Sequence, residues 1–211
     1  MIGIVFGCFI PLHKGHLRLI DKALSECDKV VIAVCGYEDD RGKDFIPFHM
    51  REYLMRQKYK YYPKVKLVYI NDKKIGLTGK FDVPAWQTWC NEIIRQAEIK
   101  PDDLCAWYTG DSSYVDSIKQ ACPNHTVIFV DRDEEPISGT EIRKDFTKYK
   151  NYIDPDFYQY LYIQNKKCKD CMFFEPHSDG DHRCTAEWGD PHLWYMGTAE
   201  DSEACWHFID K

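Results

Sequence analysis

The sequence contains no apolar stretch that approaches the ~20 residues required by a membrane-spanning helix. At its start, Met1 leads directly into an apolar strand pattern, without the basic flank or cleavage site of a secretion signal. Basic residues are not in excess either: the net charge is −6, which argues against a surface that coats nucleic acid. These absences predict a cytoplasmic protein that makes no membrane contact and for which nucleic acid is an unfavoured partner.

The acidity is concentrated near the end of the chain. Residues 166–211 contain 10 acidic and 5 basic side chains, whereas the preceding residues are almost balanced, with 24 and 23. Of the 211 residues, 44% are hydrophobic and 15% aromatic, enough to bury one core and a small appendage. We therefore expect one main domain followed by a tail of different composition. Whether the chain forms a homo-oligomer stays open.

Apolar runs and amphipathic segments alternate five times, which predicts an α/β fold with a doubly wound, five-stranded parallel sheet. The expected strands are 2–6, 29–36, 65–70, 104–109 and 125–130. The first expected helix begins near residue 15, and the next two cover 47–61 and 82–97. A fourth helix follows residue 110, and the last covers 156–164. Open sheets of this kind bind ligands beyond the carboxyl ends of their strands, so the loops there are the candidate sites.

The loop between the first expected strand and helix contains two glycines, a proline and two histidines within residues 7–16. Gly7 and Gly15 let the backbone approach a ligand, and the amides of a helix that opens near Gly15 favour an anion such as phosphate. His13 and His16 are three residues apart, so both rings can face one phosphate chain. A structural alternative, one loop histidine and one solvent-facing histidine, explains each residue alone but not the combination.

A second polar pattern occupies residues 137–143, about 125 residues later. Ser138 followed by Glu141 is a capping box, the ordinary signature of a helix start. This structural interpretation leaves Thr140 and Arg143 unexplained. The two hydroxyls and the guanidinium are suited to hold phosphate oxygens, so we predict that this segment contributes to the same site.

Together, the two patterns resemble the motifs of the HIGH-motif nucleotidyltransferase superfamily (cytidylyltransferase-like). The first reads Gly-x-Phe-x-Pro-x-His-x-Gly-His and the second Ile-Ser-x-Thr-x-x-Arg, in the family's order. The likeness covers about residues 1–150 and is greatest to the NMN adenylyltransferase domain of the bifunctional NMN adenylyltransferase/ribosylnicotinamide kinase. It implies a Rossmann-like nucleotidyltransferase fold. The pattern G-x-x-x-x-G-K-[ST] of a kinase domain does not occur, so no kinase activity is expected.

This resemblance implies roles for individual residues. His13, His16 and Arg143 would be catalytic. Arg51, in an incomplete Arg-x-x-Trp-Leu pattern, would contact the acceptor, as would Trp86, for which an ordinary core position is the equal alternative. The implied ATP-binding residues are Gly7, Cys8, Phe9, Gly15, Asp111, Arg132, Ser138 and Thr140.

The implied reaction is transfer of AMP from ATP to nicotinamide mononucleotide (NMN), which gives NAD and pyrophosphate. A phosphate oxygen of NMN would attack the α phosphorus in line, with Mg²⁺ accompanying ATP. Two alternatives stay open. The acceptor can be another phosphorylated molecule (a sugar, polyol or pantetheine phosphate), or the chain can be a nucleotide-sensing scaffold without turnover.

The tail contains many aromatic residues but almost no Ile, Leu or Val, and a core this small needs a staple. Cys168 and Cys171 form a C-x2-C knuckle, and Cys184 and Cys205 follow it. In a chain predicted to be cytoplasmic, four thiolates favour structural Zn²⁺ over two disulfides, with an iron–sulfur cluster as the alternative. The other six of the ten cysteines occupy core-like positions. We thus predict a nucleotidyltransferase domain (1–150), a C-terminal helix and linker (151–166) and a four-cysteine metal-binding module (167–211).

Overall fold

The computed structural model describes residues 1–77, 82–131, 137–164, 166, 174–175 and 183–184. The chain divides into two compact units, Met1–Asp154 and Pro155–Lys211. The first unit contains the sheet and both sequence motifs. No described helix has the length and apolarity that a membrane crossing demands.

Five parallel strands form the sheet of the first unit, in the spatial order β3-β2-β1-β4-β5. Their bounds are β1 Ile2–Gly7, β2 Lys29–Gly36, β3 Val65–Asn71, β4 Cys105–Thr109 and β5 Thr126–Phe129. The central strand β1 is in register with both neighbours, so that Val5 lies opposite Ile32 on one side and Tyr108 on the other. The predicted doubly wound parallel sheet is confirmed.

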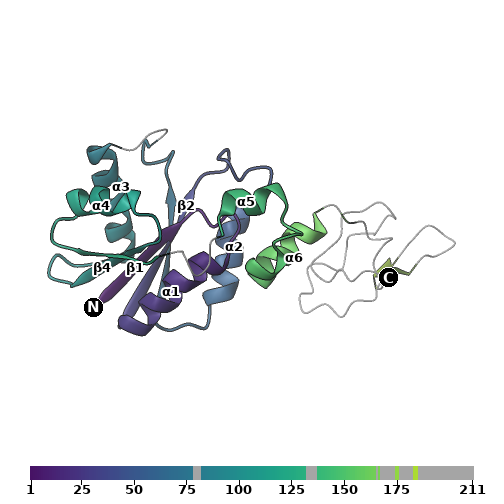
Figure 1. The fold of residues 1–211 in the computed structure, drawn as a ribbon, viewed down its shortest axis with the longest axis horizontal. Helices are drawn as coiled ribbons and strands as arrows, with labels where there is room; N and C mark the ends of the chain where they lie inside the picture. Colours follow the sequence, from purple (N-terminus) through teal and green to yellow (C-terminus); the bar gives the residue numbers. More distant parts are fainter. Residues whose placement is uncertain (78–81, 132–136, 165, 167–173, 176–182, 185–211) are drawn as a thin grey trace. The chain divides into compact units, whose positions relative to one another are not determined.

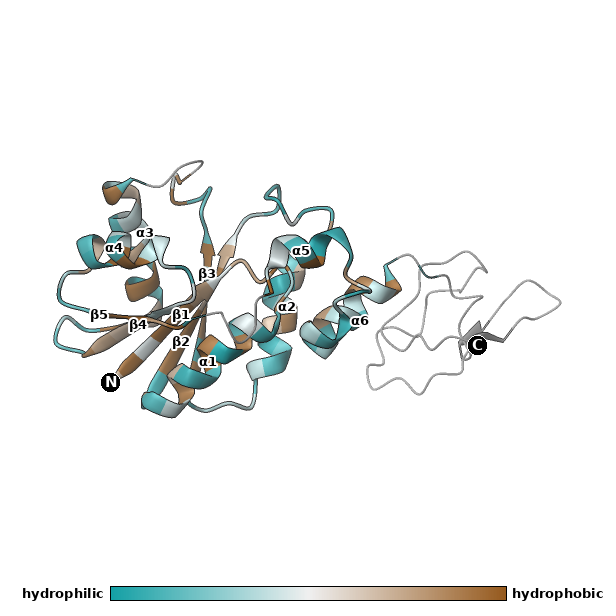
Figure 2. Ribbon diagram, viewed as in Figure 1, coloured by the Kyte–Doolittle hydropathy of each residue, from teal (hydrophilic) through white to brown (hydrophobic). Residues whose placement is uncertain are grey.

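Helices cover both faces of this sheet (Figure 1). Their bounds are α1 Lys14–Glu26, α2 Phe48–Tyr59, α3 Val83–Ala97, α4 Ser113–Ala121 and α5 Gly139–Lys144. Helices α1 and α2 lie on one face, whereas α3 and α4 pack together on the other (Figure 1). The strands are the most apolar elements and the helices turn polar faces outward (Figure 2), because a parallel sheet covered on both faces is buried throughout.

The core is built from the central strands and the helix faces that cover them. Trp107 and Tyr108 of β4 are completely buried. Five of the six cysteines of this unit are buried, as predicted: Cys27, Cys35, Cys90, Cys105 and Cys122. The sixth, Cys8, is partly exposed, because it lies in the loop that follows β1.

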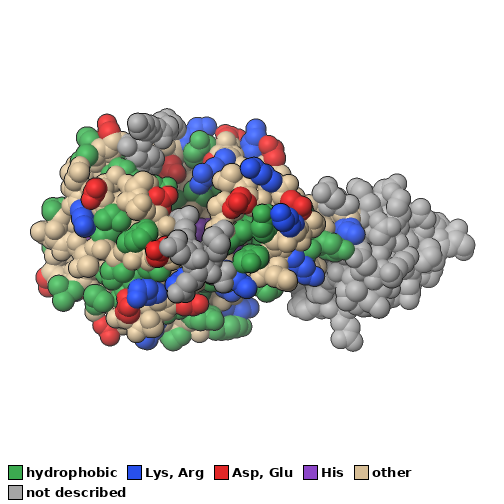
Figure 3. All heavy atoms as spheres, in the orientation of Figure 1, with side chains coloured by type: hydrophobic (Ala, Val, Ile, Leu, Met, Phe, Trp, Pro, Cys, Tyr) green, Lys and Arg blue, Asp and Glu red, His purple; other side chains and the backbone are tan. Residues whose placement is uncertain are grey.

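The strand order creates a switch point at the centre of the sheet. The chain leaves β1 toward β2 and later returns to pair β4 with the opposite edge of β1. The loops after β1 and β4 therefore diverge at their carboxyl ends, where ligands of such sheets bind. Basic and acidic side chains are intermixed on the face shown in Figure 3.

The second unit begins with α6 (Pro155–Ile163) and includes a short antiparallel pair, β6 (Phe174–Glu175) and β7 (Arg183–Cys184). Phe174 lies opposite Cys184 in this pair. Cys168, Cys171 and Cys205, together with the side chain of Cys184, are outside the described residues. The predicted metal-binding module and its bounds therefore stay predictions.

Candidate active site

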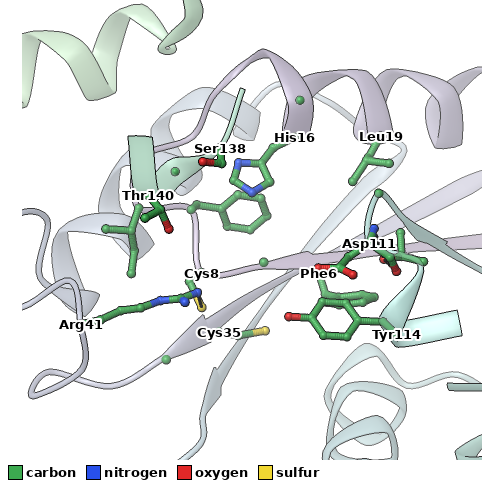
Figure 4. A pocket seen from close by; sticks show the side chains of 18 of the residues that line it. Phe6, Cys8, His16, Leu19, Cys35, Arg41, Asp111, Tyr114, Ser138 and Thr140 are labelled. Carbon is green, nitrogen blue, oxygen red and sulfur yellow. Dashed lines mark hydrogen bonds between the residues drawn. The ribbon is translucent and has the colours of Figure 1, made fainter. Parts of the chain in front are cut away.

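A cavity of about 840 Å³ opens at the carboxyl ends of the central strands. Its walls come from the loop after β1, the start of α1, the ends of β2 and β4, and α5 (Figure 4). It therefore lies at the switch point of the sheet, where the predicted site residues were expected.

The loop after β1 has a tight and unusual backbone. Phe9 adopts a positive φ of 49° and its side chain is fully buried, and the Ile10–Pro11 peptide bond is cis. Because a positive φ is uncommon for a residue with a large side chain, Phe9 is held there by its packing. Its ring lies edge-on to His16, with 5.0 Å between the ring centroids.

The two histidines of this loop stack on each other at the start of α1. Their ring centroids are 3.9 Å apart and the ring planes differ by 30°. His13 is 5% exposed and precedes the helix as its N-cap, whereas His16 is partly exposed in the first turn. Gly15 suits this close approach, because a Cβ at this position would lie only 3.1 Å from the His13 ring. Both rings line the cavity.

The second motif begins the short helix α5. The Ser138 hydroxyl accepts a hydrogen bond from the Glu141 amide and donates one to its carboxylate, so the predicted helix start with Ser138 as N-cap is confirmed. The Arg143 guanidinium donates to the hydroxyl of Thr140 and to the carbonyl of Ile10, with donor–acceptor distances of 3.0 and 2.9 Å. This last bond ties the second motif to the first across 133 residues.

One cavity contains almost all the residues that sequence analysis assigned to the site. Its lining includes His13, His16 and Arg143, together with Gly7, Cys8, Phe9, Gly15, Trp86, Asp111, Ser138 and Thr140. Arg132 is outside the described residues. Figure 4 shows Ser138, Thr140 and His16 on one side of the cavity and Asp111, Phe6 and Tyr114 on the other.

Arg41, which sequence analysis did not assign to the site, adds a cation. Its guanidinium reaches into the cavity and donates to the sulfur of Cys8 at 3.4 Å (Figure 4). Burial and the nearby charge of Arg41 together lower the pKa of Arg143. Two guanidiniums close enough to repel each other favour an anion between them.

Arg51, which the resemblance implies at the acceptor, is completely buried and is not among the residues that line the cavity. Its contact with the acceptor stays a prediction. The guanidinium donates to the carbonyls of Cys8 and Cys35 at 3.0 and 3.1 Å and to the Asp40 carboxylate at 2.7 Å. Arg51 therefore links three segments by hydrogen bonds: the loop after β1, the end of β2 and the loop after β2.

Gly36 provides the space for the Arg51 side chain. It has a φ of +132°, which side-chain-bearing residues rarely adopt. A Cβ there would overlap the Asp40 carboxylate and lie 2.8 Å from a guanidinium nitrogen of Arg51. The glycine that closes β2 is thus needed for the buried ion pair that supports the cavity.

Aromatic rings form the wall next to β1 and β4. Trp86 is 9% exposed and packs against Trp89 and Tyr114 with centroid distances of 5.5 and 5.3 Å. Phe6 packs against Trp89 at 5.1 Å. Trp86 therefore occupies a core position and also lines the cavity, whereas its contact with the acceptor stays a prediction.

Two acidic residues of the site were not found from the sequence. Asp72 follows β3 and Asp40 follows β2, and both line the cavity. The signal that could have found Asp72 is its place two residues after the predicted strand 65–70, at the same sheet edge as Asp111 after β4. Burial raises the pKa of Asp72 to about 6, and the nearby Asp40 adds to that rise.

Comparison with known proteins agrees with the family that the two motifs resemble. A family model described as cytidylyltransferase-like matches residues 4–145. The trifunctional NAD biosynthesis/regulator protein NadR of Escherichia coli (strain K12) is 30% identical over 169 residues, which cover 72% of this chain and 38% of that protein. The phosphopantetheine adenylyltransferase of Mycoplasma capricolum is 29% identical over 146 residues, covering 68% of this chain and 94% of that enzyme. A crystal structure of a NadR protein in complex with NAD and AMP-PNP superimposes with a TM-score of 0.63 at 26% identity, over 77% of this chain and 47% of that one.

The matched segment contains the whole cavity. Every residue that lines it lies within residues 4–145 of the family match, and both motifs contribute side chains to it. The chain spans less than half the length of the NadR proteins that it matches. By its motifs, its sheet and this match, the chain belongs to the cytidylyltransferase-like family of nucleotidyltransferases.

Proposed function

We propose that the chain transfers AMP from ATP to NMN, which forms NAD and releases pyrophosphate. The observation that carries this proposal is the convergence of His13, His16 and Arg143 on one cavity with an aromatic wall. The similarity to NadR proteins, one of them in complex with NAD and AMP-PNP, supports the choice of both substrates.

The reaction needs positioning and charge neutralisation more than acid–base chemistry. An oxygen of the NMN 5′-phosphate attacks the α phosphorus of ATP, and the bond from that phosphorus to the bridging oxygen of pyrophosphate breaks on the opposite side. A phosphate is already a nucleophile, so no covalent enzyme intermediate is required. His13 and His16 donate hydrogen bonds to the oxygens around the α phosphorus, where negative charge accumulates in the transition state.

We place the leaving pyrophosphate beside the two guanidinium groups of the cavity. Arg143 and Arg41 reach the cavity from α5 and from the loop after β2. The hydroxyl of Thr140, which accepts a hydrogen bond from Arg143, lies beside them. These groups stabilise the charge that develops on the departing phosphates and orient the chain of phosphates for in-line attack.

Mg²⁺ is proposed to accompany ATP. Among the residues described by the structure, no group of three or more His, Cys, Asp or Glu side chains is arranged to hold a metal ion. The donor set therefore fits an ion that is bound mainly through phosphates and water, as is usual for Mg²⁺ with a nucleoside triphosphate. When bound, the ion supplies further charge neutralisation at the phosphates.

Incubation of the purified chain with ATP, Mg²⁺ and NMN is expected to give NAD and pyrophosphate, with mass spectrometry detecting the dinucleotide. The same assay with 4′-phosphopantetheine tests the acceptor of the Mycoplasma capricolum relative, and sugar and polyol phosphates complete the panel. Turnover only with another acceptor would reassign the substrate and retain the chemistry. ATP binding without a product from any of these acceptors would instead favour a scaffold.

A second proposal concerns the tail: Cys168, Cys171, Cys184 and Cys205 bind one structural Zn²⁺. Four thiolates match the tetrahedral preference of this ion. Metal analysis of the purified chain should find about one zinc per chain, which a Cys171→Ser variant loses and a Cys8→Ser control retains. Iron in place of zinc, with visible absorption, would indicate the iron–sulfur alternative. A tail without metal would show the proposal to be wrong.

A further inference from the structure

Two free thiols share the cavity at the centre of the sheet. Cys8 is partly exposed in the loop after β1, whereas Cys35 is 5% exposed near the end of β2. Both residues line the cavity, and Figure 4 shows them beside each other, with Arg41 next to Cys8. The chemistry derived above uses neither sulfur.

The sheet places these two cysteines on neighbouring strands at the same level. The register of β1 and β2 pairs Gly7 with Val34. Cys8, the first residue after β1, therefore comes next to Cys35. The Nη1 nitrogen of Arg51 donates to the carbonyls of both cysteines, at 3.0 and 3.1 Å, which fixes the two backbones relative to each other. Neighbouring strands lie about 4.8 Å apart, within the range of about 4.4–6.8 Å over which a disulfide joins two Cα atoms.

The two thiols have different surroundings, which give them different roles. The Cys8 sulfur accepts a hydrogen bond from the guanidinium of Arg41 at 3.4 Å. Reactive cysteines lie in electropositive, partly exposed surroundings of this kind. The Cys35 thiol donates to the carbonyl of Ala33 at 3.3 Å, and burial raises its pKa well above the usual value. Cys8 is therefore the thiol that meets an oxidant first, and Cys35 is the one that reacts second.

We propose that Cys8 and Cys35 form a redox-sensitive modification site, which a peroxide converts to a disulfide and which thereby switches nucleotide transfer off. The inference adds regulation to the proposed function and rests on it for the activity that is switched. Formation of the disulfide itself does not depend on which nucleotide the chain uses.

The modification takes two steps. The Cys8 sulfur attacks one oxygen of hydrogen peroxide, the O–O bond breaks, and the products are a sulfenic acid (S–OH) on Cys8 and one water. The Cys35 sulfur then attacks the Cys8 sulfur, the S–OH bond breaks, and the hydroxyl leaves with the Cys35 proton as a second water. In sum, the two thiols lose two electrons and two protons to one peroxide.

The disulfide is expected to disable the site because it displaces the loop after β1. A disulfide holds its two Cβ atoms about 3.8 Å apart, which is closer than neighbouring strands, so Cys8 must move toward β2. This movement takes its sulfur away from Arg41 and shifts the nearby Ile10 carbonyl, to which Arg143 donates at 2.9 Å. Both cations of the phosphate end are therefore affected, and misplacement of such groups by about 1 Å can lower a rate on the order of 100-fold.

The test is hydrogen peroxide treatment of the full chain, followed by tryptic peptide mapping and by the NAD-formation assay. Cleavage after Lys14, Lys29 and Arg41 puts Cys8 and Cys35 in separate peptides that contain no other cysteine. The expected product joins these two peptides and is two hydrogen atoms lighter than their sum. NAD formation should fall at least about tenfold and return with dithiothreitol. ATP with Mg²⁺ should slow the joining, because a bound triphosphate covers Cys8.

Three variants assign the roles, each measured relative to its own activity before oxidation. Cys8→Ser should resist peroxide. Cys35→Ala should be inactivated without recovery in dithiothreitol, because a sulfenic acid that finds no second thiol is oxidised further to a sulfinic acid. Cys105→Ala is the matched control, since this cysteine is also buried on a strand of the sheet but does not line the cavity. It should respond as the wild-type chain does.

The outcomes separate this inference from the proposed function. A wild-type chain without the joined peptide, or one that stays fully active when joined, would overturn the inference and leave NAD formation intact. Full recovery of oxidised Cys35→Ala, or a Cys8→Ser variant as sensitive as the wild-type chain, would overturn it as well. If a variant does not fold, the joined peptide and the activity of the wild-type chain decide alone. A chain that forms the disulfide but never makes NAD would contradict the proposed function and retain the modification site.

Discussion

His16→Ala is expected to lower kcat for NAD formation by about a hundredfold or more, because removing one preorganised donor to transition-state charge typically has an effect of that size. His16 is the better of the two histidines for this test. His13 is almost fully buried and its backbone bridges to Ile153, so its removal would also disturb the fold. The His16 ring is partly exposed toward the cavity, and its loss leaves the packing of α1 in place.

The kinetic pattern distinguishes a catalytic role from a binding role. If His16 acts on the transition state, kcat and kcat/KM for ATP fall together, whereas loss of simple ATP binding raises KM and spares kcat. His49→Ala is the matched control, because this histidine is exposed, pairs with Glu38 on the surface and does not line the cavity. Its kcat should remain within about twofold of the wild-type value. A kcat for His16→Ala within about tenfold of wild type, with unchanged thermal unfolding, would show that His16 is not catalytic.

The sheet was predictable because its information is local. A strand buried on both faces must be apolar along its whole length, and the run from Lys29 to Gly36 is apolar after its first residue. Each predicted strand starts and ends close to the observed one. The alternation of elements then restricts the topology, since crossovers between parallel strands are right-handed.

The site was predictable only in so far as its residues belong to compact motifs. His13 and His16 are separated by three positions, and their convergence with Arg143 follows from placing both motifs at one edge of the sheet. Asp72 stands alone in the sequence, and its raised pKa arises from burial and from Asp40, which is distant along the chain. Arg41 likewise belongs to neither motif, and its side chain meets that of Cys8 at 3.4 Å only in the folded chain.

For Arg51, the motif identifies a position but not the direction in which its side chain points. The guanidinium turns away from the cavity and into the gap left by Gly36. In this structure the guanidinium contacts residues that line the cavity: the carbonyls of Cys8 and Cys35 and the carboxylate of Asp40. Stability, more than substrate affinity, is therefore the property that replacing Arg51 should change most.

Arg51→Ala is expected to reduce the free energy of unfolding by about 3–5 kcal/mol, since it leaves the Asp40 carboxylate, only 9% exposed, without its cation. Two carbonyls, of Cys8 and Cys35, also lose a donor. Urea unfolding followed by circular dichroism measures the change.

Arg95→Ala is a matched control for this experiment, because Arg95 also pairs with a carboxylate, that of Glu92, at the same 2.7 Å as the Arg51–Asp40 pair. The Arg95 side chain is 71% exposed, however, and an exposed pair of this kind contributes little to stability. The difference between the two variants therefore reports the buried ion pair of Arg51 together with its two bonds to carbonyls. Equal unfolding curves for the two variants, combined with a raised KM for NMN in Arg51→Ala, would instead restore Arg51 to the acceptor site.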